Sequence, residues 1–328
     1  MERSEILNQE VGTRDDFLEL RPSGLREFIG QKALKENLEI FIHASKVKKM
    51  AIDHILFYGP PGLGKTTLSS IISKEMGVGF RMITGPMLTK SGDLAAILTN
   101  LKPNDVLFID EIHRLNPSVE EILYSAMEDF RIDIIIGEGP AARTVKLELK
   151  PFTLIGATTK LGSISSPLRT RFGIPLQLNF YEDDELVGII LRDAGIIGLK
   201  ISEAGARMIA IRARGTPRIA IRILKRVQDI AIFEKKETVD DVFANFALDK
   251  LGVDKLGLDE MDRRYLRFII ENYSCGPVGI ETISAGIGDD ILSISDTVEP
   301  YLIRNGLIEK TPRGRVVTTK AVNHLLVL

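Results

Sequence analysis

The apolar residues of this chain follow two patterns that change along its length. In the first half, short apolar runs are bounded by polar or turn residues, as in HILFY (54–58), DVLFI (105–109) and FTLIGATT (152–159). Such runs are typical of strands buried on both faces of a parallel sheet. From 183 to 253, apolar residues recur every three or four positions, which predicts helices throughout. These patterns predict an α/β fold: a parallel sheet between helices over 18–182, then a small helical domain over 183–254, after an extension of 17 residues.

One segment of the first domain alternates instead. RIDIIIGEGPAARTVKLELK (131–150) carries apolar residues at every second position on either side of the turn cluster GEGPAA. This pattern predicts a β-hairpin inserted before the strand at 152–159. A protruding hairpin with exposed isoleucines favours a partner-binding site, and a hairpin packed on its own domain is the alternative. The candidate contact residues are Ile132, Ile134, Ile136, Val145, Leu147 and Leu149.

The last part of the chain, 255–328, has the pattern of a winged helix. DEMDRRYLRFIIENY (259–273) predicts a first helix, two further helical segments follow, and EKTPRGRVVT (309–318) predicts two strands around a basic turn. Basic side chains on such a turn suit contact with DNA phosphates, and no side chain suited to reading bases is evident. We expect Lys310, Arg313 and Arg315 to bind DNA without sequence preference; a solvated charged hairpin is the alternative.

The strongest chemical signal is GPPGLGKT (59–66), which fits the pattern G-x-x-x-x-G-K-[ST]. A buried strand precedes it and a helical pattern follows, so the backbone N–H groups of the loop and the helix N-terminus can hold phosphates. Lys65 is expected to reach the β- and γ-phosphates, and the Thr66 hydroxyl to bind Mg²⁺. The predicted nucleotide contacts are Gly59, Pro60, Pro61, Gly62, Leu63, Gly64, Lys65, Thr66 and Thr67.

Two later strands end in polar residues. The strand at 105–109 is followed by Asp110 and Glu111, a pair that suits Mg²⁺ binding by the first carboxylate and activation of the attacking water by the second. The strand FTLIGATT ends in Thr158 and Thr159, and ligands of α/β sheets bind at the carboxyl ends of strands. We expect Thr159 to contact the γ-phosphate or the water; a simple threonine cap on the strand is an equal alternative.

Two arginines stand outside these strands. PLRTRFG (167–173) holds Arg169 and Arg171, and RGTPRIA (214–220) holds Arg218 in the first turn of a predicted helix. A cation is disfavoured at a helix N-terminus, so Arg218 calls for an anionic partner. Solvated basic turns are the alternative for both segments.

Composition limits the possible partners and compartment. The chain has 328 residues, 44% of them hydrophobic and 27% charged, with a net charge of −2, so any DNA contact must come from a local basic patch. The single cysteine, Cys275, excludes an intramolecular disulfide and suits a reducing cytoplasm. The charged N-terminal segment lacks the apolar core of a signal peptide, and no apolar run is long enough to span a membrane.

Taken in order, GPPGLGKTT, DEIH, GATT and SPLRTRFG resemble the AAA+ ATPases, and longer segments resemble the RuvB family within them. Those segments include LRPSGLREFIGQ (20–31), LFIDEIHRLNPSVEEILYSAMEDF (107–130) and TPRGRVVT (311–318), and together they span nearly the whole chain. The family consists of ATP-driven motors for branch migration of Holliday junctions, acting in recombination, repair and the SOS response. Where that family usually has arginine after GATT, this chain has Lys160, which receives no role here.

The resemblance implies roles for further residues. Arg171 is expected to reach the nucleotide of a neighbouring subunit, where an arginine stabilises the charge on the γ-phosphoryl group. Arg218 is expected to contact the γ-phosphate of its own chain. The residues expected around the base and near the phosphates are Leu20, Arg21, Phe28, Ile29, Tyr181 and Pro217.

The resemblance also implies the assembly: a homo-hexamer on double-stranded DNA at four-way junctions, using ATP and Mg²⁺. A RuvA-like junction-binding protein is expected on the hairpin at 131–150, and a RuvC-like resolvase in the same pathway. Two other classes of protein carry similar ATPase motifs, namely nucleotide-controlled DNA-binding switches and protein unfoldases. Glu111 and Arg171 favour ATP turnover over a switch, and the basic C-terminal turn argues against an unfoldase.

Overall fold

The computed structural model describes residues 20–136 and 143–327. It contains two compact units. The first, called the sheet unit below, comprises Met1–Glu185 with Thr216–Arg218, and the second, the helical unit, comprises Leu186–Gly215 with Ile219–Leu328. Within the described ranges, no helix is long and apolar enough to cross a membrane.

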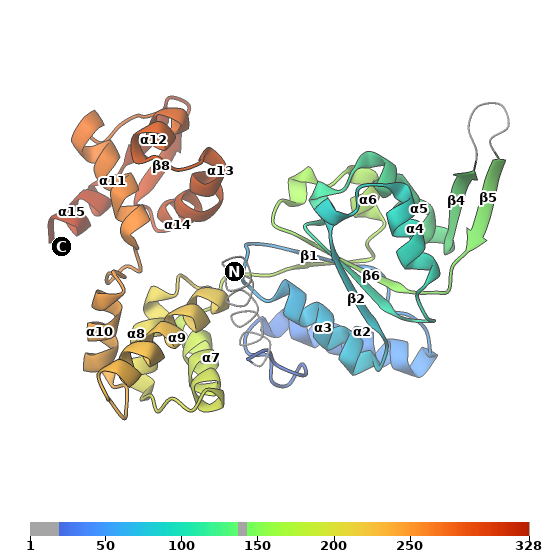
Figure 1. Ribbon diagram of the computed structural model, residues 1–328, viewed down its shortest axis with the longest axis horizontal. Helices are drawn as coiled ribbons and strands as arrows, with labels where there is room; N and C mark the ends of the chain where they lie inside the picture. The colour runs from blue at the N-terminus through green and yellow to red at the C-terminus, as the bar shows by residue number, and fades with distance from the viewer. Residues whose placement is uncertain (1–19, 137–142, 328) are drawn as a thin grey trace, which may run out of the picture. The chain divides into compact units, whose positions relative to one another are not determined.

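The sheet unit is built on parallel strands in the order β2-β3-β6-β1-β7. Figure 1 shows α2 and α3 on one face of this sheet and α4, α5 and α6 on the other, which confirms the predicted α/β fold. The strands are β1 (Ile55–Tyr58), β2 (Phe80–Thr84), β3 (Val106–Asp110), β6 (Thr153–Thr158) and β7 (Ile174–Gln177). The helices are α2 (Lys32–Lys48), α3 (Lys65–Met76), α4 (Ser91–Thr99), α5 (Pro117–Asp129) and α6 (Ser166–Thr170), with short turns η1 (Gly85–Met87), η2 (Ile112–Arg114) and η4 (Leu161–Ser163).

The apolar runs become strands because both of their faces are covered. Leu107 and Ile109 of β3 point into the same core as Leu94 of α4 and Leu123 of α5, and each of the four is fully buried. Burying one such side chain stabilises the fold by roughly 1.5–3 kcal/mol. This core fixes β3 and β6 side by side, so that the polar residues at their carboxyl ends share one edge of the sheet.

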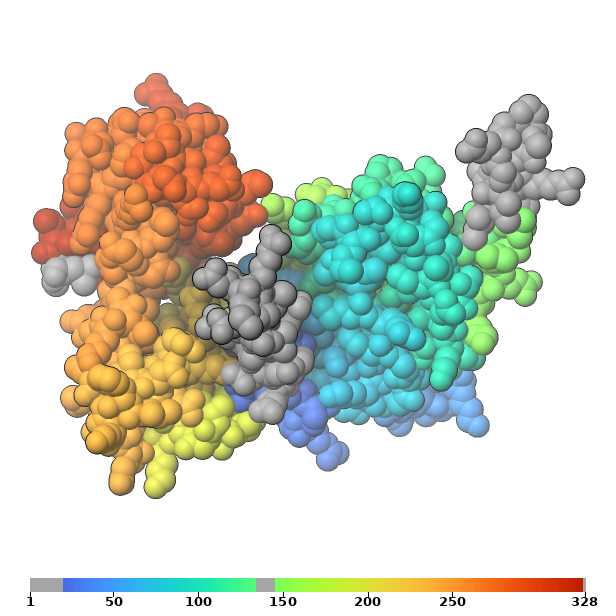
Figure 2. All heavy atoms as spheres, in the orientation of Figure 1, coloured from blue at the N-terminus to red at the C-terminus, as the bar shows by residue number. Residues whose placement is uncertain are grey.

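The predicted hairpin is present as β4 (Arg131–Ile136) paired antiparallel with β5 (Arg143–Glu148). Figures 1 and 2 show these strands standing apart from the five-stranded sheet, beside α5. The prediction that the apolar side chains are exposed is wrong for Ile132 and Leu149, which are 0% and 8% exposed. Both lie where the hairpin leaves the unit, and they pack into the core under α5.

The outer part of the hairpin differs from its base. The Val145 side chain is exposed and Leu147 is partly buried against the core. The side chains of Ile134 and Ile136, although their backbones pair in β4, lie outside the described residues. The candidate partner surface is therefore limited to the outer hairpin, because the buried residues at its base stabilise the domain itself.

The helical unit begins with the predicted helices α7 (Asp183–Ile196), α8 (Glu203–Arg212), α9 (Pro217–Phe233) and α10 (Asp241–Lys250), whose first residues at α7 and α9 belong to the sheet unit. The C-terminal part has the predicted winged-helix arrangement around its own apolar core. Its elements are α11 (Glu260–Tyr273), α12 (Ile280–Ile287), α13 (Ile291–Ser293), η5 (Ile294–Val298), α14 (Glu299–Arg304), β8 (Ile308–Thr311), β9 (Gly314–Val317) and α15 (Thr319–Val327).

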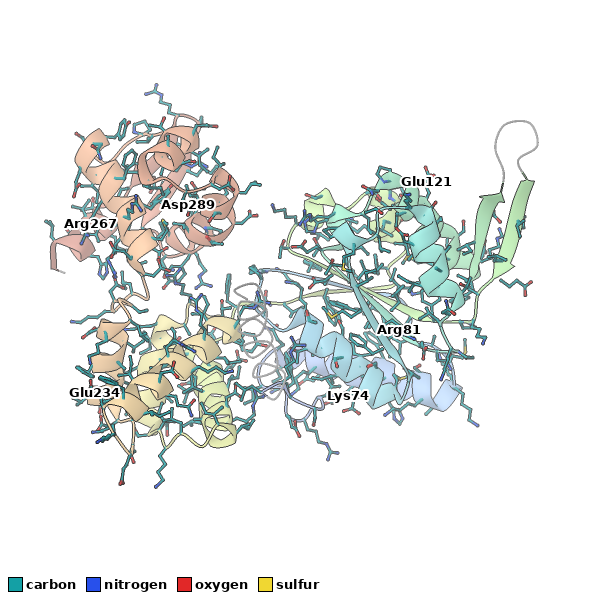
Figure 3. All side chains as sticks on the ribbon, in the orientation of Figure 1. Lys74, Arg81, Glu121, Glu234, Arg267 and Asp289 are labelled. Atoms are coloured by element: carbon teal, nitrogen blue, oxygen red, sulfur yellow. The ribbon has the colours of Figure 1, made fainter. Side chains whose placement is uncertain are left out.

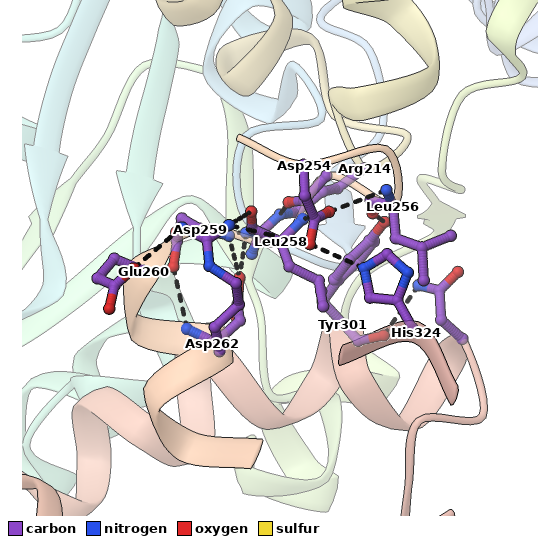
Figure 4. Close-up of polar contacts among 12 residues, drawn as sticks. Arg214, Asp254, Leu256, Leu258, Asp259, Glu260, Asp262, Tyr301 and His324 are labelled. Carbon is purple, nitrogen blue, oxygen red and sulfur yellow. Dashed lines mark hydrogen bonds and ion pairs between the residues drawn. The ribbon is translucent and has the colours of Figure 1, made fainter. Parts of the chain in front are cut away.

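An ion-pair cluster joins the two parts of the helical unit (Figure 4). Arg214, just before α9, pairs with Asp259 at 3.2 Å and with Asp262, and its guanidinium lies 4.6 Å from the centre of the Tyr301 ring. Burial raises the pKa of Asp262 to about 7, and the charge of Arg214 opposes this rise. The segment between α10 and α11 is therefore held against both parts by an arginine that is 12% exposed and an aspartate that is 1% exposed.

The basic turn of the wing is only partly available for DNA. Lys310 and Arg313 are exposed. The Arg315 side chain is 11% exposed and donates to both carboxylate oxygens of Glu299, at 2.7 and 3.2 Å. Tyr265 donates to the same carboxylate at 3.0 Å. The prediction that Arg315 contacts DNA stays a prediction, and the structure gives this guanidinium a second task, since it neutralises a buried carboxylate.

Arg315→Ala tests that assignment. The substitution leaves Glu299 buried without its counter-charge, so we expect the free energy of unfolding to fall by about 3–5 kcal/mol. The matched control is Arg313→Ala on the same turn, which should change it by less than about 0.5 kcal/mol. Urea unfolding of both variants checks this, and equal stability of the two proteins would contradict the structural role of Arg315.

Candidate nucleotide-binding site

The phosphate-binding loop connects β1 to α3 and has a backbone that favours glycine. Gly59, Gly62 and Gly64 have φ angles of 138°, 78° and 103°, and a side chain at Gly59 would meet the Leu178 carbonyl oxygen at 2.4 Å. The loop delivers Lys65 and Thr66 as the first two residues of α3. The backbone N–H groups at this helix N-terminus have no partner inside the helix, so they can bind an anion.

Lys65 is buried at the base of this loop. Its Nζ donates to the carbonyl oxygens of Gly59 and Pro60, both at 2.7 Å. Burial lowers the pKa of Lys65 to about 8, with Asp110 raising it and Arg218 lowering it further. An ammonium group desolvated in this way is stabilised by an anion, and the triphosphate of a nucleotide supplies one.

Two arginines join Lys65 near the loop. The backbone N–H of Arg218 lies 3.4 Å from the Gly62 carbonyl oxygen, and an added Cβ at Gly62 would meet the Arg218 Cβ at 3.0 Å. The pKa of Arg21 is lowered by burial and then by the nearby charge of Arg218. The charge of Arg218 therefore acts on two other cations from separate segments, Lys65 and Arg21, and an anion beside them relieves that repulsion.

The acid-tipped strand reaches the same edge of the sheet. Asp110 ends β3, and Glu111 has a left-handed backbone with φ of 49°, which is strained for a residue with a side chain. The Glu111 N–H donates to Asp110 Oδ1 at 2.9 Å, and Arg114 Nη1 donates to Glu111 Oε2 at 2.9 Å. The two successive carboxylates therefore have different partners: Asp110 accepts a backbone N–H and Glu111 accepts the Arg114 guanidinium.

The oxygen donors of Thr66 and Asp110 fit a hard cation such as Mg²⁺. Asp110 is close enough to Lys65 to raise its pKa, so the carboxylate faces the phosphate-binding loop. No group of three or more His, Cys, Asp or Glu side chains in the described residues could hold a metal by itself. A cation here needs phosphate oxygens or water to complete its ligands.

The end of β6 separates the two adjacent threonines. Thr158 is 1% exposed, and its hydroxyl lies 3.0 Å from His113 Nδ1 and accepts the Lys160 N–H at 2.9 Å. Thr159 follows the strand and is exposed. Burial lowers the pKa of His113, and Glu111 opposes this. The position of His113 in DEIH does not indicate a partner 45 residues away.

The predicted base-binding residues gather beside the loop. Leu20, Phe28 and Tyr181 are each at most 5% exposed, and the Tyr181 hydroxyl donates to the Leu63 carbonyl oxygen at 3.1 Å. An added Cβ at Gly64 would lie 3.1 Å from the Phe28 ring. Ile29 and Pro217 are partly buried. These apolar side chains come from the chain on both sides of the loop.

Arg171 has other surroundings. It follows α6, and its guanidinium contacts Tyr124, Glu128 and the Pro167 carbonyl oxygen. Of the described residues that it contacts, none belongs to the phosphate-binding loop. The structure therefore brings together the predicted residues of one nucleotide site, except for Arg171.

Three family models cover the chain: the Holliday junction DNA helicase RuvB P-loop domain at 20–178, the RuvB AAA lid domain at 181–254 and the RuvB C-terminal winged helix domain at 255–326. The chain is 53% identical over 322 residues to the Holliday junction branch migration complex subunit RuvB of Paramagnetospirillum magneticum, covering 98% of this chain and 93% of that protein. The chain belongs to the RuvB family.

Other RuvB proteins agree with this assignment. The Holliday junction branch migration complex subunit RuvB of Rickettsia africae is 55% identical over 320 residues, covering 98% of this chain and 94% of that protein. Among solved structures, the Thermotoga maritima RuvB Holliday junction branch migration motor matches with a TM-score of 0.84 at 48% identity, covering 94% of this chain and 98% of that one. The fold and the family predicted from the sequence are confirmed.

Substitutions of Lys65 and Glu111 separate binding from hydrolysis. Lys65→Ala should weaken ATP binding, because it removes the buried cation of the loop. Glu111→Gln should bind ATP normally and hydrolyse it at least about 100-fold more slowly, the usual effect of losing a general base. Fluorescent ATP binding and phosphate release measure the two steps. The control is Lys74→Ala, at an exposed position of α3, the helix that begins with Lys65; Lys74 is labelled in Figure 3. Near-normal turnover by Glu111→Gln would refute its role as the base.

Proposed function

We propose that this protein is an ATP-hydrolysing motor that translocates double-stranded DNA and drives branch migration of Holliday junctions. The observation that carries this is the site: the buried Lys65 at the base of a phosphate-binding loop, with Arg218 beside that loop and an acid-tipped strand at the same sheet edge, in a chain of the RuvB family. Its relatives bear the names of a branch migration complex subunit and a branch migration motor, which supports the proposed DNA substrate.

In the proposed reaction each residue has a separate task. Lys65 and Arg218 hold the β- and γ-phosphates, and the backbone of 59–66 surrounds them. Glu111 takes a proton from the attacking water, and Thr159 helps to orient that water or the γ-phosphate. Thr66 and Asp110 would hold Mg²⁺, which when bound neutralises developing phosphate charge. Strand pairing of β3, β6 and β1 supports this division, since their carboxyl ends lie side by side.

Arg171 acts on the site of a neighbouring copy in this proposal. Its described contacts involve no residue of its own phosphate-binding loop, and it lies at the end of α6 with part of its guanidinium exposed. An arginine supplied to the γ-phosphate accelerates hydrolysis by a factor of about 10³–10⁵. Hydrolysis therefore depends on assembly, and we propose a homo-hexamer around DNA.

Contacts with DNA and partners follow from the exposed surfaces. Lys310 and Arg313 on the wing suit sequence-independent contact with phosphates. The outer hairpin, with exposed Val145 and the pair Ile134 and Val145 opposite each other in the ladder, is proposed to bind a RuvA-like junction-binding protein. A RuvC-like resolvase is placed in the same pathway, and the compartment is proposed to be the cytoplasm.

The function is tested on a synthetic four-way junction with labelled arms. Together with the RuvA-like partner and ATP, we expect the protein to separate the junction into two duplexes. A non-hydrolysable ATP analogue should permit binding but no separation. Separation at the same rate without ATP would contradict a motor, and failure at all partner concentrations, with ATP turnover intact, would contradict branch migration.

A mixture of two inactive proteins tests the action of Arg171 on a neighbour. Arg171→Ala should bind ATP and hydrolyse it poorly, and Lys65→Ala should not bind ATP normally. Mixed rings pair an intact Lys65 of one chain with an intact Arg171 of the next, so ATPase activity should recover if single interfaces can act. Full activity of the Arg171→Ala protein alone would refute this assignment, because hydrolysis would then not need an arginine from the neighbouring chain.

A further inference from the structure

The guanidinium of Arg171 is held against one face of α5. Its Cζ lies 4.6 Å from the centre of the Tyr124 ring. Its Nε lies 3.1 Å from Glu128 Oε1, and its Nη1 donates to the Pro167 carbonyl oxygen at 2.7 Å. Tyr124 and Glu128 are four residues apart, so they lie one above the other on the same side of the helix.

The same face of α5 also holds the other end of α6. Ser165, which caps the N-terminus of α6, donates to Glu120 Oε1, and the Tyr124 hydroxyl donates to that oxygen at 2.9 Å. Glu120 is four residues before Tyr124, so one row of side chains contacts α6 at its start and at the arginine that follows it. The phenol hydroxyl fixes the ring, and the face of the ring lies against the guanidinium.

The two contacts of Arg171 with α5, the Tyr124 ring and the Glu128 carboxylate, differ in strength. The Glu128 side chain is 55% exposed, and an ion pair with so exposed a carboxylate contributes little. The Nε of Arg171 is buried and lies close to Glu128 without hydrogen-bond alignment. The Arg171 side chain is 22% exposed and the Tyr124 ring is partly buried, where a cation–π contact is stronger than at a fully exposed site. Of the two contacts with α5, the ring is therefore the stronger restraint, and it acts together with the hydrogen bond from Nη1 to the Pro167 carbonyl oxygen.

These contacts leave part of the guanidinium available. An arginine has five N–H donors, and within the described residues one Nη1 proton is used by Pro167 and Nε faces Glu128. The Nη2 group keeps its two N–H donors for another acceptor. A guanidinium already fixed in direction loses less side-chain freedom when it binds a phosphoryl group, which favours the transition state.

We propose that Tyr124 is a positioning residue for hydrolysis at the neighbouring subunit's site, because it fixes the direction of the Arg171 guanidinium. This inference rests on the proposed function of Arg171 as a residue that acts in trans. It predicts that replacing Tyr124 lowers the rate of ATP hydrolysis when the change is in the chain that supplies the arginine. The same change in the chain that binds the reacting ATP should have no effect.

The mixture of Lys65→Ala and Arg171→Ala proteins allows that pattern to be measured. In the productive interface, the Lys65→Ala chain supplies the arginine and the Arg171→Ala chain supplies the ATP site. Adding Tyr124→Leu to the Lys65→Ala chain should lower the recovered ATPase activity by about three- to thirty-fold, the range expected for losing a cation–π contact. Adding Tyr124→Leu to the Arg171→Ala chain should leave the recovered activity unchanged.

Homogeneous proteins give a second measurement. Tyr124→Leu alone should lower kcat for ATP by about three- to thirty-fold with KM nearly unchanged, and Tyr124→Phe, which keeps the ring face, should restore most of the rate. The control is Glu121→Gln on the same helix, at an exposed position labelled in Figure 3, which should retain the normal rate. On the Arg171→Ala background, Tyr124→Leu should cause no further loss.

The failures of the two hypotheses are distinguishable. Full activity of Arg171→Ala by itself would refute the trans role of Arg171 and, with it, the role of Tyr124. If Arg171→Ala is inactive, then equal losses from Tyr124→Leu in both chains of the mixture, or no loss in either, would overturn the positioning role alone. Unchanged recovered activity with Tyr124→Leu in the chain that binds the reacting ATP would also show that a chain with this substitution folds and assembles.

Discussion

The repulsion among three cations beside the phosphate-binding loop is the constraint on which the rest of the site depends. Burial lowers the pKa of Lys65 to about 8, and the charge of Arg218 lowers the pKa of both Lys65 and Arg21. Such an arrangement is unfavourable until an anion lies between the charges. We therefore expect a triphosphate to contact three segments of the chain: the segment before α2, the loop and the start of α9.

The residues proposed to act in ATP hydrolysis lie in two places, at the carboxyl ends of parallel strands and against helix α5. Parallel strands bring Asp110, Glu111 and the threonines after β6 to one edge, next to the loop, where they can contact phosphate and water. Arg171 is restrained by α5 instead, through Tyr124 and Glu128. If Arg171 acts on a neighbouring copy, as we propose, each chain holds an ATP site that lacks this arginine and an arginine that lies away from its own site. Assembly would then complete both sites, so ATP turnover would depend on ring formation.

Local patterns predicted much of this structure. The loop, the acid-tipped strand, the hairpin and the start of α9 at Pro217 are set by short-range spacing of glycine, apolar and turn residues, and all are present. Burial depends on packing against distant residues, which local spacing does not indicate: Arg315 pairs with the buried Glu299, and Ile132, expected to be exposed, joins the core under α5. The contact of Tyr124 with Arg171 joins positions 47 residues apart that no sequence motif connects.

The central claim is that one nucleotide links three segments of the chain. Hydrogen exchange of the Glu111→Gln protein, with and without ATP and Mg²⁺, measures this directly, because amides that become hydrogen-bonded or buried exchange more slowly. Peptides covering 20–30, 59–68 and 214–220 should gain protection together, over the same range of ATP concentration. Protection confined to 59–68 would contradict the account, since the loop would then bind ATP without closing the other two segments on it.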